Sequence, residues 1–202
     1  MAAPISVVIP TLEAAGRLGP TLASLTEGLV EGLVRELVIS DGGSRDGIET
    51  LAEELGAVLV TGPPSRGGQL RRGCAAARGA WLLVLHADTA LAAGWTREAR
   101  RHMAEAPEAA GWFRLAFDAR GAAPALVAGW ANLRSARLGL PYGDQGLLVA
   151  REVYEAAGGY PDQPLMEDVA LARRLPLRPL DAVATTSAER YRRDGWLRRG
   201  AR

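Results

Sequence analysis

The chain has 202 residues, 48% of them hydrophobic, and a formal net charge of +1. This length suits a single domain with a substantial core, and the balanced charge argues against nucleic acid or another generic polyanion as a partner. All 24 basic residues are arginine, which excludes a Schiff-base or P-loop lysine but supplies planar guanidinium groups that match phosphates and carboxylates.

The single cysteine, Cys74, lies in an apolar stretch, where we expect buried packing in a protein of a reducing compartment. No signal peptide is expected before the first strand. No run of about 18 apolar residues predicts a membrane span. We therefore predict a cytoplasmic protein, with at most a peripheral contact at the inner face of the membrane.

The first half of the chain alternates strands and helices. In chain order, the hydrophobic pattern predicts a strand at 5–9, a helix at 19–33, a strand at 37–40, a helix at 46–56, a strand at 57–60, a helix at 68–79 and a strand at 81–85. Asp46 is the expected N-cap of its helix, and Gly56 is expected to follow the end of that helix. This alternation predicts an α/β sheet with parallel, right-handed connections.

The second half is less regular. It predicts a helix at 95–105, a strand at 110–117, a helix at 124–138, a polar loop at 139–146, an extended segment at 147–150, helices at 151–157 and 168–175, and a strand at 180–184. Trp130 can pack on the sheet or on a partner, which leaves a homodimer open. The basic end from Arg190 to Arg202 is expected to be mobile.

Polar residues follow three of the predicted strands. Because the carboxyl ends of parallel strands meet at one edge of a sheet, these residues are expected to line a ligand cleft there. They are Thr11, Glu13, Asp41, His86 and Asp88, with Pro10 beside Thr11. Asp88 and His86 could together hold a divalent cation. Asp88 or Thr89 could equally cap a following helix, and this segment alone supports both interpretations.

Arg66-Gly67-Gly68-Gln69 precedes a predicted helix. Glycines before a helix favour anion binding through backbone N–H groups, and Arg66 and Arg71 could clamp a diphosphate. The alternative is a solvated helix face. No strand is followed by Gly-x-Gly-x-x-Gly, and no Gly-Lys-Ser/Thr occurs, so the usual dinucleotide and P-loop sites are excluded.

Two more polar segments lie in the second half. Glu167 and Asp168 open a predicted helix, where one acid can cap and the other can face the cleft and accept a proton from a hydroxyl. Gly143-Asp144-Gln145 offers hydrogen-bonding groups suited to sugar hydroxyls. Simple capping and a surface turn are the respective alternatives.

Taken in order, these segments resemble a family-2 glycosyltransferase with the GT-A fold, along nearly the whole chain. The resemblance is carried by Val8-Ile9-Pro10-Thr11-Leu12-Glu13, Val38-Ile39-Ser40-Asp41-Gly42-Gly43-Ser44-Arg45-Asp46-Gly47, Arg66-Gly67-Gly68-Gln69, Leu85-His86-Ala87-Asp88-Thr89, Gly143-Asp144-Gln145-Gly146 and Met166-Glu167-Asp168-Val169-Ala170-Leu171. Together with Thr186-Ser187-Ala188, the fourth and fifth segments are similar to a bacterial subgroup of radical-SAM/selenodomain-associated transferases.

The resemblance implies a single GT-A-type domain over 1–202, with a Rossmann-like open mixed sheet, mostly parallel, and helices on both faces. It implies a nucleotide-sugar-binding half at 1–90, an acceptor and catalytic half at 91–189, and a basic tail at 190–202. The implied reaction is a metal-dependent, inverting sugar transfer from a UDP- or GDP-linked donor to an unidentified hydroxyl acceptor.

The resemblance also implies roles for individual residues. The nucleotide-sugar-binding residues would be Pro10, Thr11, Glu13, Asp41, Arg66, Arg71 and Asp88. Asp88, with His86 as a second ligand, would hold Mn²⁺ or Mg²⁺. Asp168 matches the family's catalytic base, with Glu167 as a supporting acid or alternative base. The residues near the acceptor or sugar would be Gly143, Asp144 and Gln145.

Two positions depart from the family pattern: His86 stands where an Asp is usual, and Arg71 where a smaller polar residue is expected. One alternative is a sugar-phosphate nucleotidyltransferase, which Pro10-Thr11-Leu12-Glu13 disfavours because it replaces a Gly-rich loop with Arg and Lys. The other is a non-catalytic GT-A-like nucleotide- or sugar-binding protein. His86 supports that alternative, and the retained acids Asp88, Glu167 and Asp168 oppose it.

Overall fold

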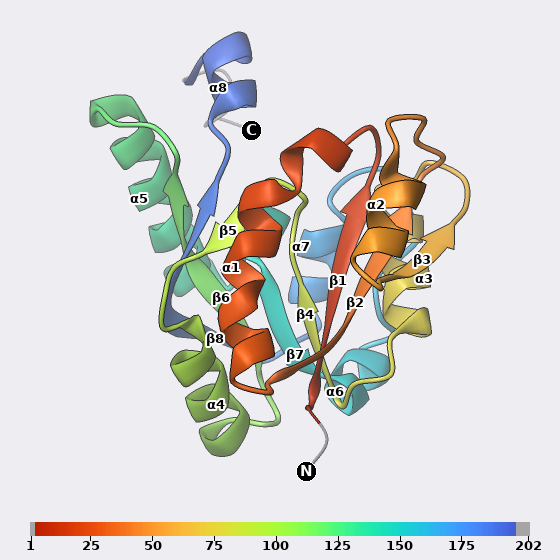
Figure 1. Cartoon of the computed structure of the whole chain (residues 1–202). Coiled ribbons are helices and arrows are strands. Elements are labelled where there is room, and N and C mark those ends of the chain that lie inside the picture. The colour runs from red at the N-terminus through yellow and green to blue at the C-terminus, as the bar shows by residue number, and fades with distance from the viewer. Residues whose placement is uncertain (1–2, 197–202) are drawn as a thin grey trace.

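A computed structural model describes residues 3–196. Its centre is one eight-stranded sheet with the strand order β3-β2-β1-β4-β7-β6-β8-β5. The strands are β1 (Ile5–Thr11), β2 (Val34–Asp41), β3 (Val58–Thr61), β4 (Trp81–Val84), β5 (Thr89–Leu91), β6 (Ala110–Phe117), β7 (Leu147–Ala150) and β8 (Leu177–Thr186). Strands β3, β2, β1 and β4 run parallel, as do β6 and β8, whereas β7 pairs antiparallel with both β4 and β6. The predicted open mixed sheet is confirmed (Figure 1).

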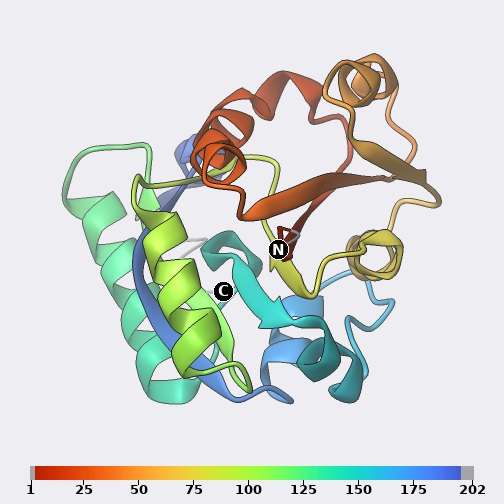
Figure 2. The ribbon, with the colours of Figure 1, turned by 60° about the horizontal axis from the view of Figure 1, so that its bottom comes forward.

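Helices cover both faces of this sheet, as predicted. They are α1 (Gly19–Val30), α2 (Ile48–Glu54), α3 (Arg66–Ala76), α4 (Trp95–Glu105), α5 (Ala122–Leu138), α6 (Arg151–Ala156), α7 (Glu167–Ala172) and α8 (Glu189–Asp194), with short 3₁₀ turns η1 (Ala15–Arg17) and η2 (Gly143–Gln145). Side chains alternate along β1: Val7 and Ile9 join the core cluster that includes Leu25 of α1, whereas Val8 joins the cluster that includes Leu70 of α3. Figure 2 shows α4 and α5 on opposite sides of β8.

The end of α2 is confirmed, and its predicted start is wrong. Gly56 follows the helix with a φ of 60°, as expected for a helix end. Asp46 does not cap the helix, because its carboxylate accepts the backbone N–H of Ala15 at 2.7 Å instead. Gly47, in a left-handed conformation, is the residue that precedes the helix. A contact from a distant segment therefore takes the side chain that local sequence assigns to the cap.

The capping alternative for Asp88 and Thr89 is also wrong. Thr89 begins β5, a three-residue strand that the sequence pattern does not reveal. The next helix, α4, begins at Trp95 after Gly94. The Asp88 carboxylate is therefore left for another role.

The basic end of the chain is helical as far as the structure describes it. Helix α8 is followed by Trp196, and the rings of Tyr191 and Trp196 pack on Phe117 with centroid distances of 4.8 and 5.1 Å. Residues 190–196 thus lie against the domain through these rings, while residues 197–202 of the predicted basic end lie outside the described residues. Among residues 3–196, no helix has the length and apolar content needed to cross a bilayer.

Candidate active site

Two adjoining hollows lie at the carboxyl ends of β1 and β4. The first has a volume of about 290 Å³ and is lined by Pro10, Thr11, Leu12, Ala14, Arg17, Arg66, Gln69, His86, Ala87, Asp88 and Arg190. The second has a volume of about 380 Å³, and its lining includes Tyr142, Gly143, Asp144, Met166, Glu167, Asp168, Thr186, Ser187 and Tyr191. Four residues line both hollows, namely Arg66, His86, Asp88 and Arg190. Four of the predicted strand-end residues, Pro10, Thr11, His86 and Asp88, therefore converge with the acidic pair Glu167 and Asp168.

Thr11 and Asp41 form a rigid floor beside the first hollow. The Thr11 hydroxyl donates to one Asp41 oxygen at 2.9 Å, and the backbone N–H groups of Gly43 and Ser44 donate to the other at 2.7 Å. Burial alone would raise the pKa of Asp41, but hydrogen bonds, led by those from Ser44 and Thr11, outweigh it and lower that pKa. Asp41 is 2% exposed and acts here by holding the strand ends in place.

The amino end of α3 is closed rather than open to an anion. The Gly67 N–H donates to the Gln163 carbonyl at 3.2 Å, and the Gly68 N–H donates to the Ser65 hydroxyl at 3.2 Å. A Cβ on Gly67 would lie 2.0 Å from the Pro161 carbonyl oxygen. The predicted anion site at these backbone groups is therefore wrong: the glycines allow close packing of the 161–163 loop.

Arg66 stands between the two hollows and joins them. Its Nε lies 2.9 Å from Oε1 of Glu167, and its Nη2 lies 2.8 Å from Nε2 of His86. Because a guanidinium can only donate, His86 Nε2 is the acceptor and the ring proton resides on Nδ1. Burial, with the charges of Arg66 and Arg190, lowers the pKa of His86 to about 3, so the ring is neutral.

The Asp88 carboxylate faces the junction without a hydrogen bond from any residue between 3 and 196. Its backbone is fixed, since the Ser187 N–H donates to the Asp88 carbonyl at 3.1 Å. The structure thus leaves a hard oxygen donor available at the meeting point of the hollows. Mg²⁺ is commonly bound by one or two carboxylates together with substrate phosphates, and Asp88 fits that pattern. No group of three or more His, Cys, Asp or Glu side chains in the described part of the chain forms a metal cage.

Asp168 is held in the second hollow by α7 and the η2 turn. Its Oδ2 accepts the Gly143 N–H at 2.6 Å, and its Oδ1 accepts the Val169 N–H at 2.7 Å. A Cβ on Gly143 would lie 2.5 Å from His86 Nε2 and 3.3 Å from Asp168 Oδ2, so glycine permits this close approach. Burial raises the pKa of Glu167, against the charge of Arg66. Asp168 is the more exposed acid of the pair and faces the hollow.

Asp144 carries the most unusual carboxyl of the second hollow. Its Oδ1 is buried and has no hydrogen-bond partner in the described residues. Burial raises its pKa to about 6, opposed by Arg134 and reinforced by the charge of Asp168. At neutral pH this buried group is therefore ionised at a cost in folding stability.

Asp144→Asn should therefore stabilise the protein in a pH-dependent way. The raised pKa means that the folded state binds the proton between about pH 4 and pH 6 while the unfolded state releases it, so stability falls as pH rises through this window. We expect the variant to exceed the parent by about 1–3 kcal/mol near pH 7.5 and to match it near pH 4. Urea unfolding at both pH values measures this, with the exposed Glu53→Gln as control. A stability difference that does not change with pH would contradict the assignment.

Four predicted site residues line neither hollow, namely Asp41, which lies beneath the first hollow as described above, and Gln145, Glu13 and Arg71. Gln145 is fully buried, where its amide bonds Ser135, Phe113 and Asn132, so we do not retain it as an acceptor contact. Glu13 turns toward the Arg45 N–H, which it accepts at 2.9 Å. Arg71 is exposed and lines neither hollow, because it lies on the outward side of α3.

Other lining residues escaped the sequence prediction. Gln69 donates to the carbonyls of Thr11 and Ser40 at 2.6 and 3.2 Å and so ties α3 to both strand ends. The sequence signal that could have identified Gln69 as a lining residue is its position directly after Gly67-Gly68. Arg17 and Arg190 also line the first hollow. Arg190 gave no signal, since it opens the segment that the sequence presents as a basic tail.

Comparisons with known proteins agree with this arrangement. The family model described as "Glycosyl transferase family 2" matches residues 6–138. A glucosyl-3-phosphoglycerate synthase of Mycolicibacterium paratuberculosis (strain ATCC BAA-968 / K-10) is 36% identical over 93 residues, which are 42% of this chain and 28% of that protein.

Two solved structures share the fold. Staphylococcus aureus TarS 1–349 gives a TM-score of 0.69 at 15% identity, covering 98% of this chain and 64% of that one. The mannosyltransferase PcManGT from Pyrobaculum calidifontis, in complex with GDP-Man and Mn²⁺, gives 0.68 at 21% identity, covering 96% and 61%. The chain thus spans less than two thirds of each of these relatives.

The sheet order, the strand-end cleft and these likenesses define the fold as that of the GT-A glycosyltransferases. The match over residues 6–138 covers most of the chain, so the chain belongs to glycosyl transferase family 2. The resemblance predicted from the sequence is confirmed at the level of family and fold.

Proposed function

We propose that this protein transfers a sugar from a nucleoside-diphosphate sugar to a hydroxyl acceptor. The observation that carries the proposal is the meeting of two hollows at Arg66, His86, Asp88 and Arg190. The first hollow belongs to the parallel half of the sheet, and the second contains the carboxylate of Asp168. A donor in the first hollow and an acceptor in the second would meet at this junction.

The donor is proposed to be UDP- or GDP-linked. Thr11 and Pro10 line the first hollow beside the Asp41 network, where a nucleoside would lie. Arg17, Arg66 and Arg190 surround the same space and would face the diphosphate, since guanidinium groups bind phosphate oxygens in charge-assisted pairs. TarS has been solved with UDP-GlcNAc and PcManGT with GDP-Man, which supports this class of donor.

Asp88 is the residue proposed to hold Mg²⁺ or Mn²⁺. When bound, the cation would neutralise charge on the departing nucleoside diphosphate. The lone pair of His86 Nε2 is engaged by Arg66, so His86 would have to exchange that bond to become a ligand. We therefore propose that the main role of His86 is to orient the Arg66 guanidinium as a neutral hydrogen-bond acceptor.

Asp168 is proposed as the base. Its carboxylate would take the proton from the acceptor hydroxyl as that oxygen forms its bond to the anomeric carbon. The bond from the anomeric carbon to the diphosphate breaks, and its electron pair leaves with the phosphate oxygen. The acceptor oxygen would attack from the second hollow, on the side of the anomeric carbon opposite the diphosphate in the first hollow. Such an attack inverts the configuration at the anomeric carbon. Glu167 supports this step by holding Arg66 in place.

Donor binding can be tested without knowing the acceptor. We expect UDP or GDP to raise the melting temperature only with Mn²⁺ or Mg²⁺, because Asp88 alone leaves most of the cation's ligands to the phosphates. Asp88→Asn should weaken metal-dependent nucleotide binding by about tenfold or more, as removal of a charged ligand predicts. Thermal shift across a nucleotide and metal panel measures both effects. An unchanged thermal shift in Asp88→Asn would exclude Asp88 as the metal ligand.

A further inference from the structure

The outward face of α5 is apolar along most of its length, with Arg137 as its one exposed charged residue among residues 122–138. Four large side chains on it are largely exposed: Leu126 (72%), Trp130 (58%), Leu133 (47%) and Leu138 (65%). The other exposed positions of the helix are Ala122, Ala123, Ala125, Gly129, Ala136 and Arg137. The helix contains no Asp or Glu. A surface helix normally turns charged residues to solvent, so this face departs from the rule.

The protein core does not need this face. The inward side of α5 buries Pro124, Ala131 and Ser135, and Asn132 exchanges hydrogen bonds of 2.8 and 3.1 Å with the backbone of Leu115 in β6. The outward residues are therefore free to vary without loss of packing. Within residues 3–196, nothing covers them.

Arginines lie at both ends of the apolar face. Arg137 lies within it, and Arg120 precedes the helix; both are exposed and have no ion pair in the described chain. The neighbouring helix α8 packs beside α5 in a shared cluster and carries Arg192 and Arg193, whereas its Arg190 lines the two hollows. Arg192 and Arg193 lie near Asp118 and Asp194, in exposed pairs that solvent screens. The sequence beyond adds Arg198, Arg199 and Arg202 without an acid.

We propose that α5 and α8 dock on an anionic lipid surface. Leu and Trp side chains enter the headgroup boundary of a bilayer, and arginines pair with lipid phosphates at the same depth. A second copy of the chain would match the apolar stripe but would bring the two basic rims together. An anionic lipid surface would bury the apolar side chains and would also offer phosphates to the neighbouring arginines.

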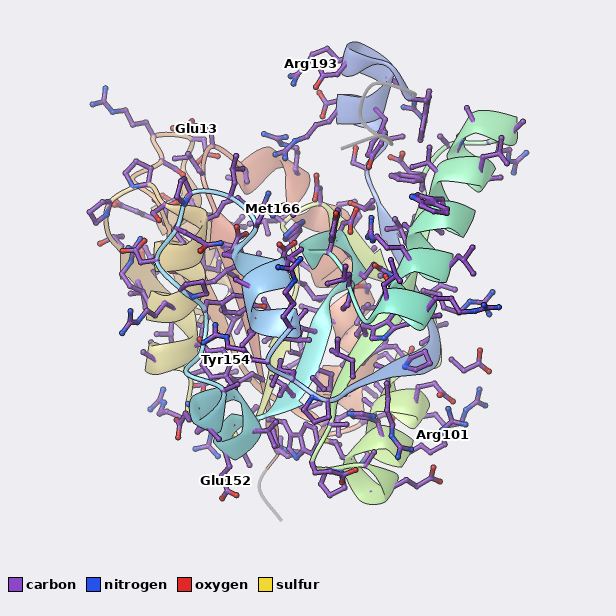
Figure 3. All side chains as sticks on the ribbon, turned by 180° about the vertical axis from the view of Figure 1, so that it is seen from behind. Glu13, Arg101, Glu152, Tyr154, Met166 and Arg193 are labelled. Carbon is purple, nitrogen blue, oxygen red and sulfur yellow. The ribbon has the colours of Figure 1, made fainter. Side chains whose placement is uncertain are left out.

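The α8 side of the proposed docking surface adjoins the second hollow. Arg190 and Tyr191 of α8 line the second hollow, and its rim includes the exposed Leu165 and Met166. Figure 3 shows Met166 and Arg193 toward the same end of the molecule. Docking through α5 and α8 therefore brings the mouth of the second hollow near the lipid headgroups. The docking itself does not depend on the proposed activity.

Co-sedimentation of the full chain with vesicles tests the proposal. We expect binding to phosphatidylcholine vesicles that contain phosphatidylglycerol and much weaker binding to phosphatidylcholine alone. Leu126→Glu and Trp130→Glu should each reduce binding about tenfold or more, as expected when a large apolar side chain no longer enters the bilayer. Val30→Glu on α1 is the matched control, because Val30 is 83% exposed on another helix, and it should bind as the parent does.

Circular dichroism of each variant verifies that α5 remains folded. Equal binding by Leu126→Glu, Trp130→Glu and the parent would overturn the proposal, as would equal binding to vesicles with and without phosphatidylglycerol. Analytical ultracentrifugation provides the remaining outcome. A dimer that dissociates in Trp130→Glu, together with absence of vesicle binding, would assign the face to a second copy of the chain instead.

Discussion

Asp168→Asn should lower donor turnover by about 10²–10⁴-fold, the usual range for loss of a positioned general base. The amide has the shape of the carboxylate but cannot take the acceptor's proton. Its oxygen can still accept the Gly143 N–H that Asp168 Oδ2 accepts at 2.6 Å. Turnover is measured as nucleoside diphosphate released from the donor that gives the largest thermal shift.

The thermal shift with donor separates chemistry from binding in this variant. Asp168 lines only the second hollow, so the shift should persist in Asp168→Asn. Asp181→Asn is a suitable control, since its side chain is 76% exposed and pairs only loosely with Arg114 at 3.7 Å. A fully active Asp168→Asn would exclude Asp168 as the base. Donor binding without any turnover by the parent, with every metal tried, would favour a non-catalytic binding protein.

Gly67→Ala should destabilise the protein by about 3 kcal/mol, at the upper end of the usual cost of overpacking. The added methyl group would lie 2.0 Å from the Pro161 carbonyl oxygen and within 2.9 Å of two backbone atoms of Gln163. Backbone cannot move aside as a flexible side chain can, so the 161–163 loop must separate from α3. Because Arg66 adjoins this glycine, nucleotide binding should weaken as well.

Gly129→Ala provides the matched control, since it makes the same change in another helix. A Cβ on Gly129 meets nothing within 4 Å. Helix propensity alone then predicts a gain of about 1 kcal/mol. Urea unfolding of the two variants should give changes of opposite sign. A mild effect of Gly67→Ala would mean that the loop is not held as described.

The sequence predicted the sheet well because its strands are short, continuous apolar runs. Trp81–Val84 is buried throughout, and β6, β7 and α4 have the predicted bounds. The convergence of Thr11 and Asp88 on one hollow was also predictable, since parallel strands fix where their carboxyl ends lie. Local patterns carried these predictions, and long-range contacts did not alter them.

Three of the failures arise from contacts between segments that are apart in the sequence. Asp46 binds the Ala15 N–H rather than its own helix. Gln145 looks like a polar loop residue, yet Ser135 and Asn132 of α5 draw its amide into the core. Gly67 suggested an anion site, whereas its N–H serves Gln163. None of these partners is near in sequence, and one chain offers no signal of the pairing.

The bridging position of Arg66 sets a rule for building chimeras between relatives. Its guanidinium contacts His86 in one half of the cleft and Glu167 in the other. The family match ends at residue 138, before Glu167. A graft that replaces the chain after that point must therefore bring an acid to position 167. Without it, the half-exposed Arg66 guanidinium would lose the buried carboxylate that holds it in place. The interchangeable unit is therefore the cleft as a whole rather than either half.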